Sequence, residues 1–162
     1  MVAETPQQGK RRYWLYAWLP VLIGTGLVAI SSSSTFSAQH TSGPFRWIYE
    51  HLFGHVSNAH WGRIHFYIRK GCHFCGYAVF GLFWLRAWWL TLPRARFLQD
   101  AALAVLGAGI VASADEFHQH FIPSRTGSPW DVLLDCCGAL TVQLIVYIYL
   151  RIFRPKKLDR VA

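Results

Sequence analysis

Long apolar segments alternate with shorter polar ones along the chain. Four of them approach the length of a membrane-spanning helix, and they cover residues 13–30, 71–92, 98–114 and 131–150. About 20 consecutive apolar residues are needed to cross the hydrocarbon core of a bilayer. The pattern therefore predicts an all-α protein, folded as a bundle of four transmembrane helices.

Residues 31–69, between the first two predicted spans, mix apolar and polar positions. Four apolar side chains recur there at helical spacing beside charged ones: Trp47, Ile48, Leu52 and Phe53. This arrangement is typical of a short amphipathic helix on a membrane surface, and we expect it on the outer surface. The segment also carries five histidines. His51 and His55 are one helical turn apart, but their spacing fixes no third ligand, so no metal site is predicted.

The composition narrows the class of protein. Hydrophobic residues make up 53% of the chain, and there are eight tryptophans. A typical soluble domain is less apolar. The formal net charge is +8, but the basic residues flank the apolar segments and do not alternate with aromatic residues as in a nucleic-acid groove. Membrane lipid is therefore the expected partner, and nucleic acid is not.

The basic residues also predict the orientation. Four spans place both termini on one side, which holds eleven lysines and arginines against five on the other. The positive-inside rule assigns the richer side to the cytoplasm. We expect residues 1–12 and 151–162 to be cytoplasmic tails of a cell-membrane domain covering residues 13–150. The first apolar segment is longer than the ~7–15-residue core of a signal peptide, although small residues that suit a cleavage site follow it.

Polar residues that are costly beside a membrane gather near the third and fourth predicted spans. Half of the eight acidic residues lie here among other polar side chains: Asp115, Glu116, His118, Gln119, Arg125, Asp131 and Asp135. On the second span, Lys70, His73 and Tyr77 share one helix face, at positions i, i+3 and i+7. In the predicted topology all of these residues reach the outer membrane face. Ionisable groups in such places are usually functional, so we expect an outward-facing polar pocket.

The four cysteines form two pairs within predicted spans. Cys72 and Cys75 make a CxxC motif, and Cys136 and Cys137 are adjacent. Adjacent residues point about 100° apart around a helix, so the set lacks the turn geometry of a zinc knuckle. We expect the cysteines to act as small packing residues, and zinc ligation and disulfide formation remain the alternatives.

Three segments together resemble the VanZ-like family of bacterial membrane proteins: RKGCHFCGYAVFG, DEFHQHFIPSRTGSPWD and DVLLDCCGAL. In that family a Lys-x-x-His-Phe opening precedes an acidic-x-x-Gln segment, an arginine and an Asp-x-x-x-Asn/Asp-x-x-Gly helix. The matching positions are Lys70, His73, Phe74, Tyr77, Asp115, Glu116, Gln119, Arg125, Asp131, Asp135 and Gly138. Asp135 stands where several members carry asparagine. The resemblance implies a role in the cell envelope, in susceptibility to glycopeptide antibiotics of the teicoplanin type, and it supplies no reaction.

Two classes of function fit the polar residues. In the first, the pocket binds a lipid headgroup or cell-wall precursor through Lys70, His73, Tyr77, Asp115, Glu116, Gln119, Arg125, Asp131 and Asp135. In the second, a membrane-embedded enzyme uses Glu116 or Asp115 with His73 or His118 as acid and base on a lipid-linked substrate. Familiar catalytic motifs such as GxSxG, HExxH and the P-loop are absent from the sequence, and no cofactor is expected. A third interpretation makes the acids structural partners of Lys70, His73 and Arg125. We rank binding first.

Overall fold

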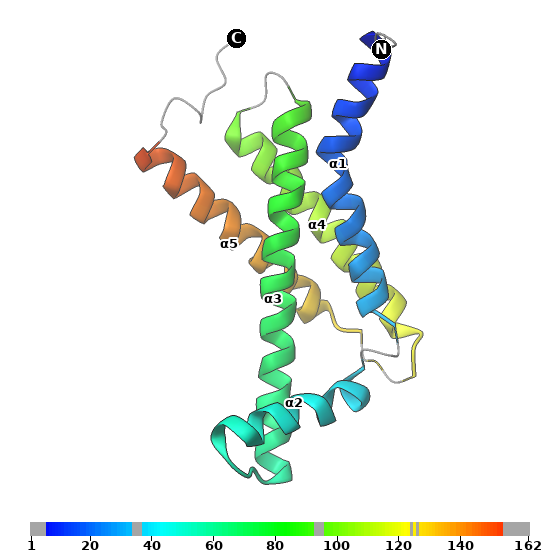
Figure 1. Ribbon diagram of the computed structural model, residues 1–162, viewed down its shortest axis with the longest axis vertical. Helices are drawn as coiled ribbons and strands as arrows, with labels where there is room; N and C mark the ends of the chain where they lie inside the picture. The colour runs from blue at the N-terminus through cyan, green and yellow to red at the C-terminus, as the bar shows by residue number, and fades with distance from the viewer. Residues whose placement is uncertain (1–5, 34–36, 93–95, 124, 126, 154–162) are drawn as a thin grey trace, which may run out of the picture.

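The computed structural model describes residues 6–33, 37–92, 96–123, 125 and 127–153. Five helices make up this part of the chain: α1 (Pro6–Ser31), α2 (Ala38–Phe53), α3 (Asn58–Thr91), α4 (Phe97–His120) and α5 (Pro129–Phe153) (Figure 1). No strand occurs among the described residues. The predicted all-α class is therefore confirmed.

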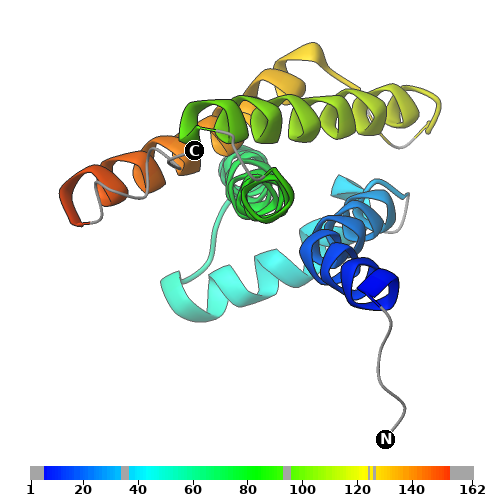
Figure 2. The ribbon, with the colours of Figure 1, turned by 90° about the horizontal axis from the view of Figure 1, so that it is seen from above.

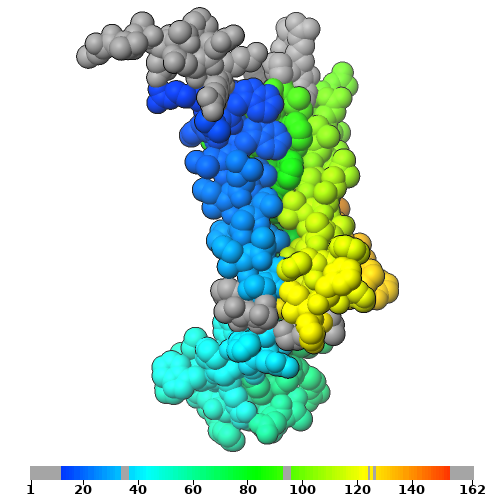
Figure 3. All heavy atoms as spheres, turned by 90° about the vertical axis from the view of Figure 1, so that its right-hand side faces the viewer, coloured from blue at the N-terminus to red at the C-terminus, as the bar shows by residue number. Residues whose placement is uncertain are grey.

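Helix α3 lies at the centre and packs against each of the other four helices. Seen from above, α4 and α5 lie on one side of α3, while α1 and α2 lie on the other (Figure 2). The start of α1 and the end of α5 lie at one end of the bundle, and α2 crosses the opposite end (Figure 1). Figure 3 shows α1 and α4 side by side on one face, with α2 below them. The polar residues of the predicted pocket lie at the end that α2 covers.

Small residues allow the helices to approach closely. Ala104, Ala108 and Ala112 of α4 are at most 1% exposed, so this face of small residues is buried. A Cβ atom on Gly138 of α5 would overlap the carbonyl oxygen of Phe74 in α3. Close backbone approach at small residues is the usual way in which helices associate in lipid. The α3–α5 crossing at Gly138 brings these two helices into contact.

An arginine in α3 donates hydrogen bonds to backbone carbonyls near a proline in α1. Pro20 lacks a backbone N–H, so the carbonyl of Tyr16, four residues earlier, loses its helical partner. The guanidinium of Arg86 donates to this carbonyl and to that of Ala17, both at 2.9 Å. The same guanidinium lies 4.3 Å from the centre of the Tyr16 ring. Arg86 thus attaches α1 to α3 near one end of the bundle.

Helix α3 begins well before residue 71, where the second span was predicted to start, and is 34 residues long. The side chain of Ser57 accepts a hydrogen bond from the backbone N–H of His60 and so caps the first turn. Trp61 and His65, one turn apart, are about 5% and 6% exposed and bond to Ser42 and Thr41 of α2. Because α2 covers this part of α3, the buried residues here include polar as well as apolar side chains.

Helix α2 confirms a helix in residues 31–69, although it covers only 38–53. Its apolar residues Trp47, Leu52 and Phe53 are more than 60% exposed. At its end, Glu50 accepts hydrogen bonds from Arg46 at 3.0 Å and from the backbone N–H of Val56 at 3.3 Å. The bond from Arg46, then that from Val56, lower the pKa of Glu50. The bond from Val56 ties the end of α2 to the loop that precedes α3.

Three of the described helical segments are long and apolar enough to cross a membrane: Arg12–Ser31, Phe97–His120 and Pro129–Phe153. Their mean hydropathies are 1.6, 1.6 and 1.8. Helix α3, which contains the predicted second span, is not among them. Its His73, Arg86 and several tryptophans lower its mean hydropathy. The structure therefore supports three of the four predicted spans by length and composition.

Candidate functional site

The predicted site residues come from three helices and one loop, and they meet at the end of the bundle that α2 covers. They are Lys70, His73 and Tyr77 on α3; Asp115, Glu116 and Gln119 on α4; Asp131 and Asp135 on α5; and Arg125 between α4 and α5. On α4, Asp115, Glu116 and Gln119 are 7%, 5% and 4% exposed. This is unusual, because acidic side chains are rarely buried without partners.

Local hydrogen bonds orient the acidic residues of α4. The side-chain amide of Gln119 donates to Asp115, one turn earlier, at 2.8 Å. The backbone N–H of Ser128 donates to Oε2 of Glu116, also at 2.8 Å. Beside it, a Cβ atom on Gly127 would overlap the carbonyl oxygen of Glu116. A glycine at 127 therefore lets the loop return against the last turns of α4 and present its N–H to the Glu116 carboxylate.

Lys70 and Asp131 form an ion pair between α3 and α5. Their side chains are 28% and 14% exposed. The acids were expected to find cationic partners at this depth, and for Lys70 this is confirmed. The pair joins the two helices that cross at Gly138.

Arg125 does not pair with a carboxylate in the part of the chain that the structure describes. It donates instead to the main-chain carbonyls of Ser31 and Ser33, the latter at 2.9 Å, at the end of α1. Carbonyls at a helix C-terminus lack helical partners and carry partial negative charge. Burial, and then the nearby positive charge of Arg69, lower the pKa of Arg125. Of the two basic residues offered as structural partners of the acids, Lys70 therefore has a carboxylate partner, and Arg125 binds main-chain carbonyls.

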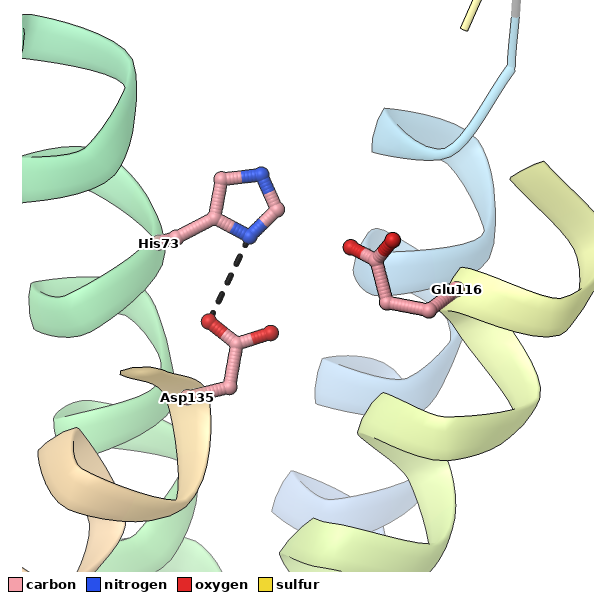
Figure 4. A group of neighbouring side chains, drawn as sticks. All are labelled: His73, Glu116 and Asp135. Carbon is pink, nitrogen blue, oxygen red and sulfur yellow. Dashed lines mark ion pairs between the residues drawn. The ribbon is translucent and has the colours of Figure 1, made fainter. Parts of the chain in front are cut away.

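His73, Glu116 and Asp135 form a compact group contributed by three helices (Figure 4). One nitrogen or oxygen atom from each lies within 4.8 Å of the other two. Nδ1 of His73 is 3.3 Å from Oδ1 of Asp135. Figure 4 shows the Glu116 carboxylate pointing toward the other two side chains. Sequence spacing missed this set as a group of ligands, because no two of its members share a helix.

The other candidates of the sequence analysis lie apart from this group. His118 is exposed, and its Nδ1 is 3.2 Å from the hydroxyl of Ser32. Of the two histidines proposed as acid or base, only His73 therefore lies with Glu116. All four cysteines are free thiols, and only Cys136 is partly buried. His51 bonds to the carbonyl of Trp47 on α2, far along the chain from the group.

Two cavities meet at the site. The larger, about 570 Å³, lies between α1, α3 and α4 and is walled mainly by apolar side chains such as Leu27, Val79 and Phe80; we call it the apolar cavity. The smaller, about 260 Å³, is lined largely by polar residues including Lys70 and Asp131; we call it the polar cavity. Four residues line both: Arg69, His73, Gln119 and Arg125.

Arg69 is a site residue that the sequence analysis missed. It lines both cavities and makes no ion pair with any of the residues the structure describes. Its place beside Lys70 in the RKGCHF motif was the available indication. It went unused because a basic residue at the end of a span is normally an interfacial anchor.

Residues 14–152, most of the chain, match the family model described as VanZ/LLP1. The chain belongs to the VanZ/LLP1 family, which confirms the resemblance carried by the three motifs. No curated protein and no solved structure matches it. Family membership and the three apolar helices together identify a VanZ-like membrane protein.

Proposed function

We propose that the protein binds the anionic headgroup of a membrane amphiphile at the outer face of the cell membrane. The observation that carries this proposal is the junction of the polar and apolar cavities at Arg69, His73, Gln119 and Arg125. A polar headgroup and an apolar chain of one molecule require such a pair of adjoining spaces. The apolar cavity, at about 570 Å³, falls within the usual size of ligand sites.

The charges favour an anion. Arg69 makes no ion pair with the described residues, and Arg125 uses its guanidinium on uncharged carbonyls. Guanidinium groups match phosphate and carboxylate oxygens with parallel hydrogen bonds. Lipid-linked cell-wall precursors combine a phosphate, a donor-rich head and a long apolar chain. We therefore propose that binding such a precursor modulates susceptibility to teicoplanin-type glycopeptides.

The proposal includes four membrane spans, with α3 as the fourth and both termini in the cytoplasm. Two observations support it. Helix α3 packs against three helices that are apolar enough to span, and the side that holds the termini carries eleven basic residues against five on the other side. The polar side chain of Tyr77 on α3 is buried, as expected where a polar group of a spanning helix faces the bundle and not the lipid. On this arrangement the two cavities open toward the outer leaflet.

The test compares Arg69→Gln with Arg63→Gln. Arg63 is an exposed residue of α3 that lines neither cavity, so it controls for charge and helix propensity. Purified protein is titrated with a polyprenyl phosphate and with phosphatidylcholine, and binding is followed by native mass spectrometry. Losing a charge-assisted hydrogen bond, about 1.5–3 kcal/mol, should weaken binding of the phosphate lipid roughly 10- to 100-fold.

Arg63→Gln should bind as the wild type does, and phosphatidylcholine should bind weakly to all three proteins. At equal protein level, cells expressing Arg69→Gln should differ in teicoplanin susceptibility from cells expressing the wild type, because the variant binds less of the phosphate lipid. The proposal fails if the wild type does not prefer the phosphate lipid, or if Arg69→Gln retains that preference.

A membrane-embedded enzyme is the second candidate, and the proximity of His73 and Glu116 favours it. A histidine and a carboxylate within one small group can serve as acid and base for a bound substrate. Incubation with a polyprenyl diphosphate would reveal turnover through release of phosphate. Turnover that Glu116→Gln abolishes would establish the enzyme, and a stable bound lipid without product would leave the binding function.

A further inference from the structure

Two carboxylates in the group formed by His73, Glu116 and Asp135 are buried without adequate partners. Glu116 is 5% exposed and Asp135 is 0% exposed. Oε1 of Glu116 and both carboxylate oxygens of Asp135 accept no hydrogen bond from the residues that the structure describes. Buried polar atoms in native proteins are nearly always paired, and the exceptions usually mark a water molecule or an ion. These three oxygen atoms require such an explanation.

The neighbouring cations do not supply one. Lys70 is paired with Asp131, and Arg125 donates to carbonyls of α1. Among the described residues, His73 is the cationic side chain that contacts this group, with Nδ1 at 3.3 Å from Oδ1 of Asp135, a contact that does not count as a hydrogen bond to Oδ1. Uncompensated carboxylates in a low-dielectric interior are strongly unfavourable. One imidazole cannot balance two of them.

We propose that His73, Glu116 and Asp135 bind a divalent transition-metal ion. A 2+ charge balances the two carboxylates, and imidazole with carboxylate oxygen is a ligand set suited to Zn²⁺, Fe²⁺ or Mn²⁺. Ligands about 2.1 Å from a tetrahedral ion lie about 3.4 Å from one another. The 3.3 Å separation of His73 and Asp135 matches that spacing. The three ligand atoms of the set lie within 4.8 Å of one another, so small side-chain rotations would bring all of them to it.

The surroundings are those of a metal centre with an open position. The N–H of Ser128 holds Oε2 of Glu116, and such outer contacts orient metal ligands. The buried hydroxyl of Tyr77 has no hydrogen-bond partner in the described part of the chain, so it can bond to a water molecule at the ion. Three protein ligands leave coordination positions free. Because His73 lines both cavities, a water molecule or an anionic ligand can reach them.

The metal site stands independently of lipid binding, so it is tested in lipid-free detergent. Purified protein is dialysed against a chelator and titrated separately with Zn²⁺ and Mn²⁺. Bound metal is measured by mass spectrometry, and the melting temperature is recorded with and without the ion. Glu116→Gln and His73→Gln remove ligands. Glu50→Gln, at a half-buried residue of α2, and His60→Gln, at an exposed residue of α3, make the same changes outside the group.

The wild type should bind about one ion per chain and melt at a higher temperature with it, as a ligand specific to the native state requires. The ligand variants should bind at least about tenfold more weakly, and the controls should match the wild type. Without metal, Glu116→Gln should melt no lower than the wild type, because it removes a buried charge. A folded wild-type protein that binds neither ion overturns the proposal, and so do ligand variants with unchanged affinity.

Cobalt substitution identifies the ligands even if a variant does not fold. Co²⁺ bound by nitrogen and oxygen shows visible d–d bands without the near-ultraviolet sulfur charge-transfer band of a thiolate site. We expect the first spectrum in the wild type. A thiolate band would assign the ion to the cysteines of α3 and α5 and would refute the site proposed here.

Discussion

Replacing Gly138 with alanine should force α3 and α5 apart where they cross. A Cβ atom at this position would overlap the carbonyl oxygen of Phe74 and lie 3.3 Å from the backbone nitrogen of Ala78. Both contacts are main-chain atoms of a helix, so neither can rotate away as a side chain does. The helix as a whole must shift, and it also packs against α1 and α4.

The magnitude follows from two opposing effects. Overpacking of a close contact costs about 1–3 kcal/mol. Replacing glycine with alanine inside a helix returns about 0.5–1 kcal/mol of backbone entropy. The net effect of Gly138→Ala should be a loss of about 1–2 kcal/mol, or a decrease of roughly 2–8 °C in melting temperature for a chain of this size.

Gly71→Ala is the matched control. Gly71 lies in α3, and a Cβ atom there would contact nothing within 4 Å, so only the entropic gain remains. Thermal unfolding of both variants in the same detergent should move the melting temperature in opposite directions. Gly138→Ala should also weaken metal binding, because His73 adjoins Phe74 and Asp135 lies one turn before Gly138. Equal stability of the two variants would refute the close crossing of α3 and α5.

Three further changes test other parts of the structure. Lys70→Met should cost about 1–2 kcal/mol in chemical unfolding, less than the ~3–5 kcal/mol of a fully buried pair because Lys70 is partly exposed, and Lys70→Arg should retain most of the stability. In a cysteine-free background, His60→Cys should react with an impermeant thiol reagent from outside the cell and Arg96→Cys should not; the reverse pattern would invert the proposed topology. The pKa of Glu50 is lowered on folding, so its stabilising effect is present above its ordinary value near 4.5 and is lost as the pH falls through the folded value. Hydrogen-exchange protection at the end of α2, measured relative to the intrinsic exchange rate at each pH, should therefore fall in acid, and Glu50→Gln should remove that pH dependence.

Local pattern predicted the helices well, because apolar length and polar interruption are properties of a single segment. It also predicted that Lys70 would meet an acid, since both ends of that pair lie at the same depth. The start of α3 was missed because Trp61 and His65 are covered by α2, which makes a buried segment look irregular. Only the weak capping residue Ser57 marked its true beginning.

The contacts between helices could not be predicted in the same way. Whether Asp135 faces His73 or lipid depends on the rotation of α5, which the close approach at Gly138 determines. The target of Arg125 was missed for a different reason. It binds main-chain carbonyls, and a carbonyl is present at every position, so no residue type marked Ser31 and Ser33 as its partners.

The attachment of α1 has a consequence for how the chain can vary. Arg86 holds this helix near its middle and Arg125 at its C-terminal end, both through backbone oxygens. A backbone oxygen survives any side-chain replacement, so natural drift at Ser33 leaves the contact intact, whereas loss of either arginine removes it. In a saturation-mutagenesis scan, substitutions of Arg86 in α3 and of Arg125 in the loop after α4 should therefore disturb the position of α1. Most substitutions of the residues whose carbonyls they bind should have little effect on it.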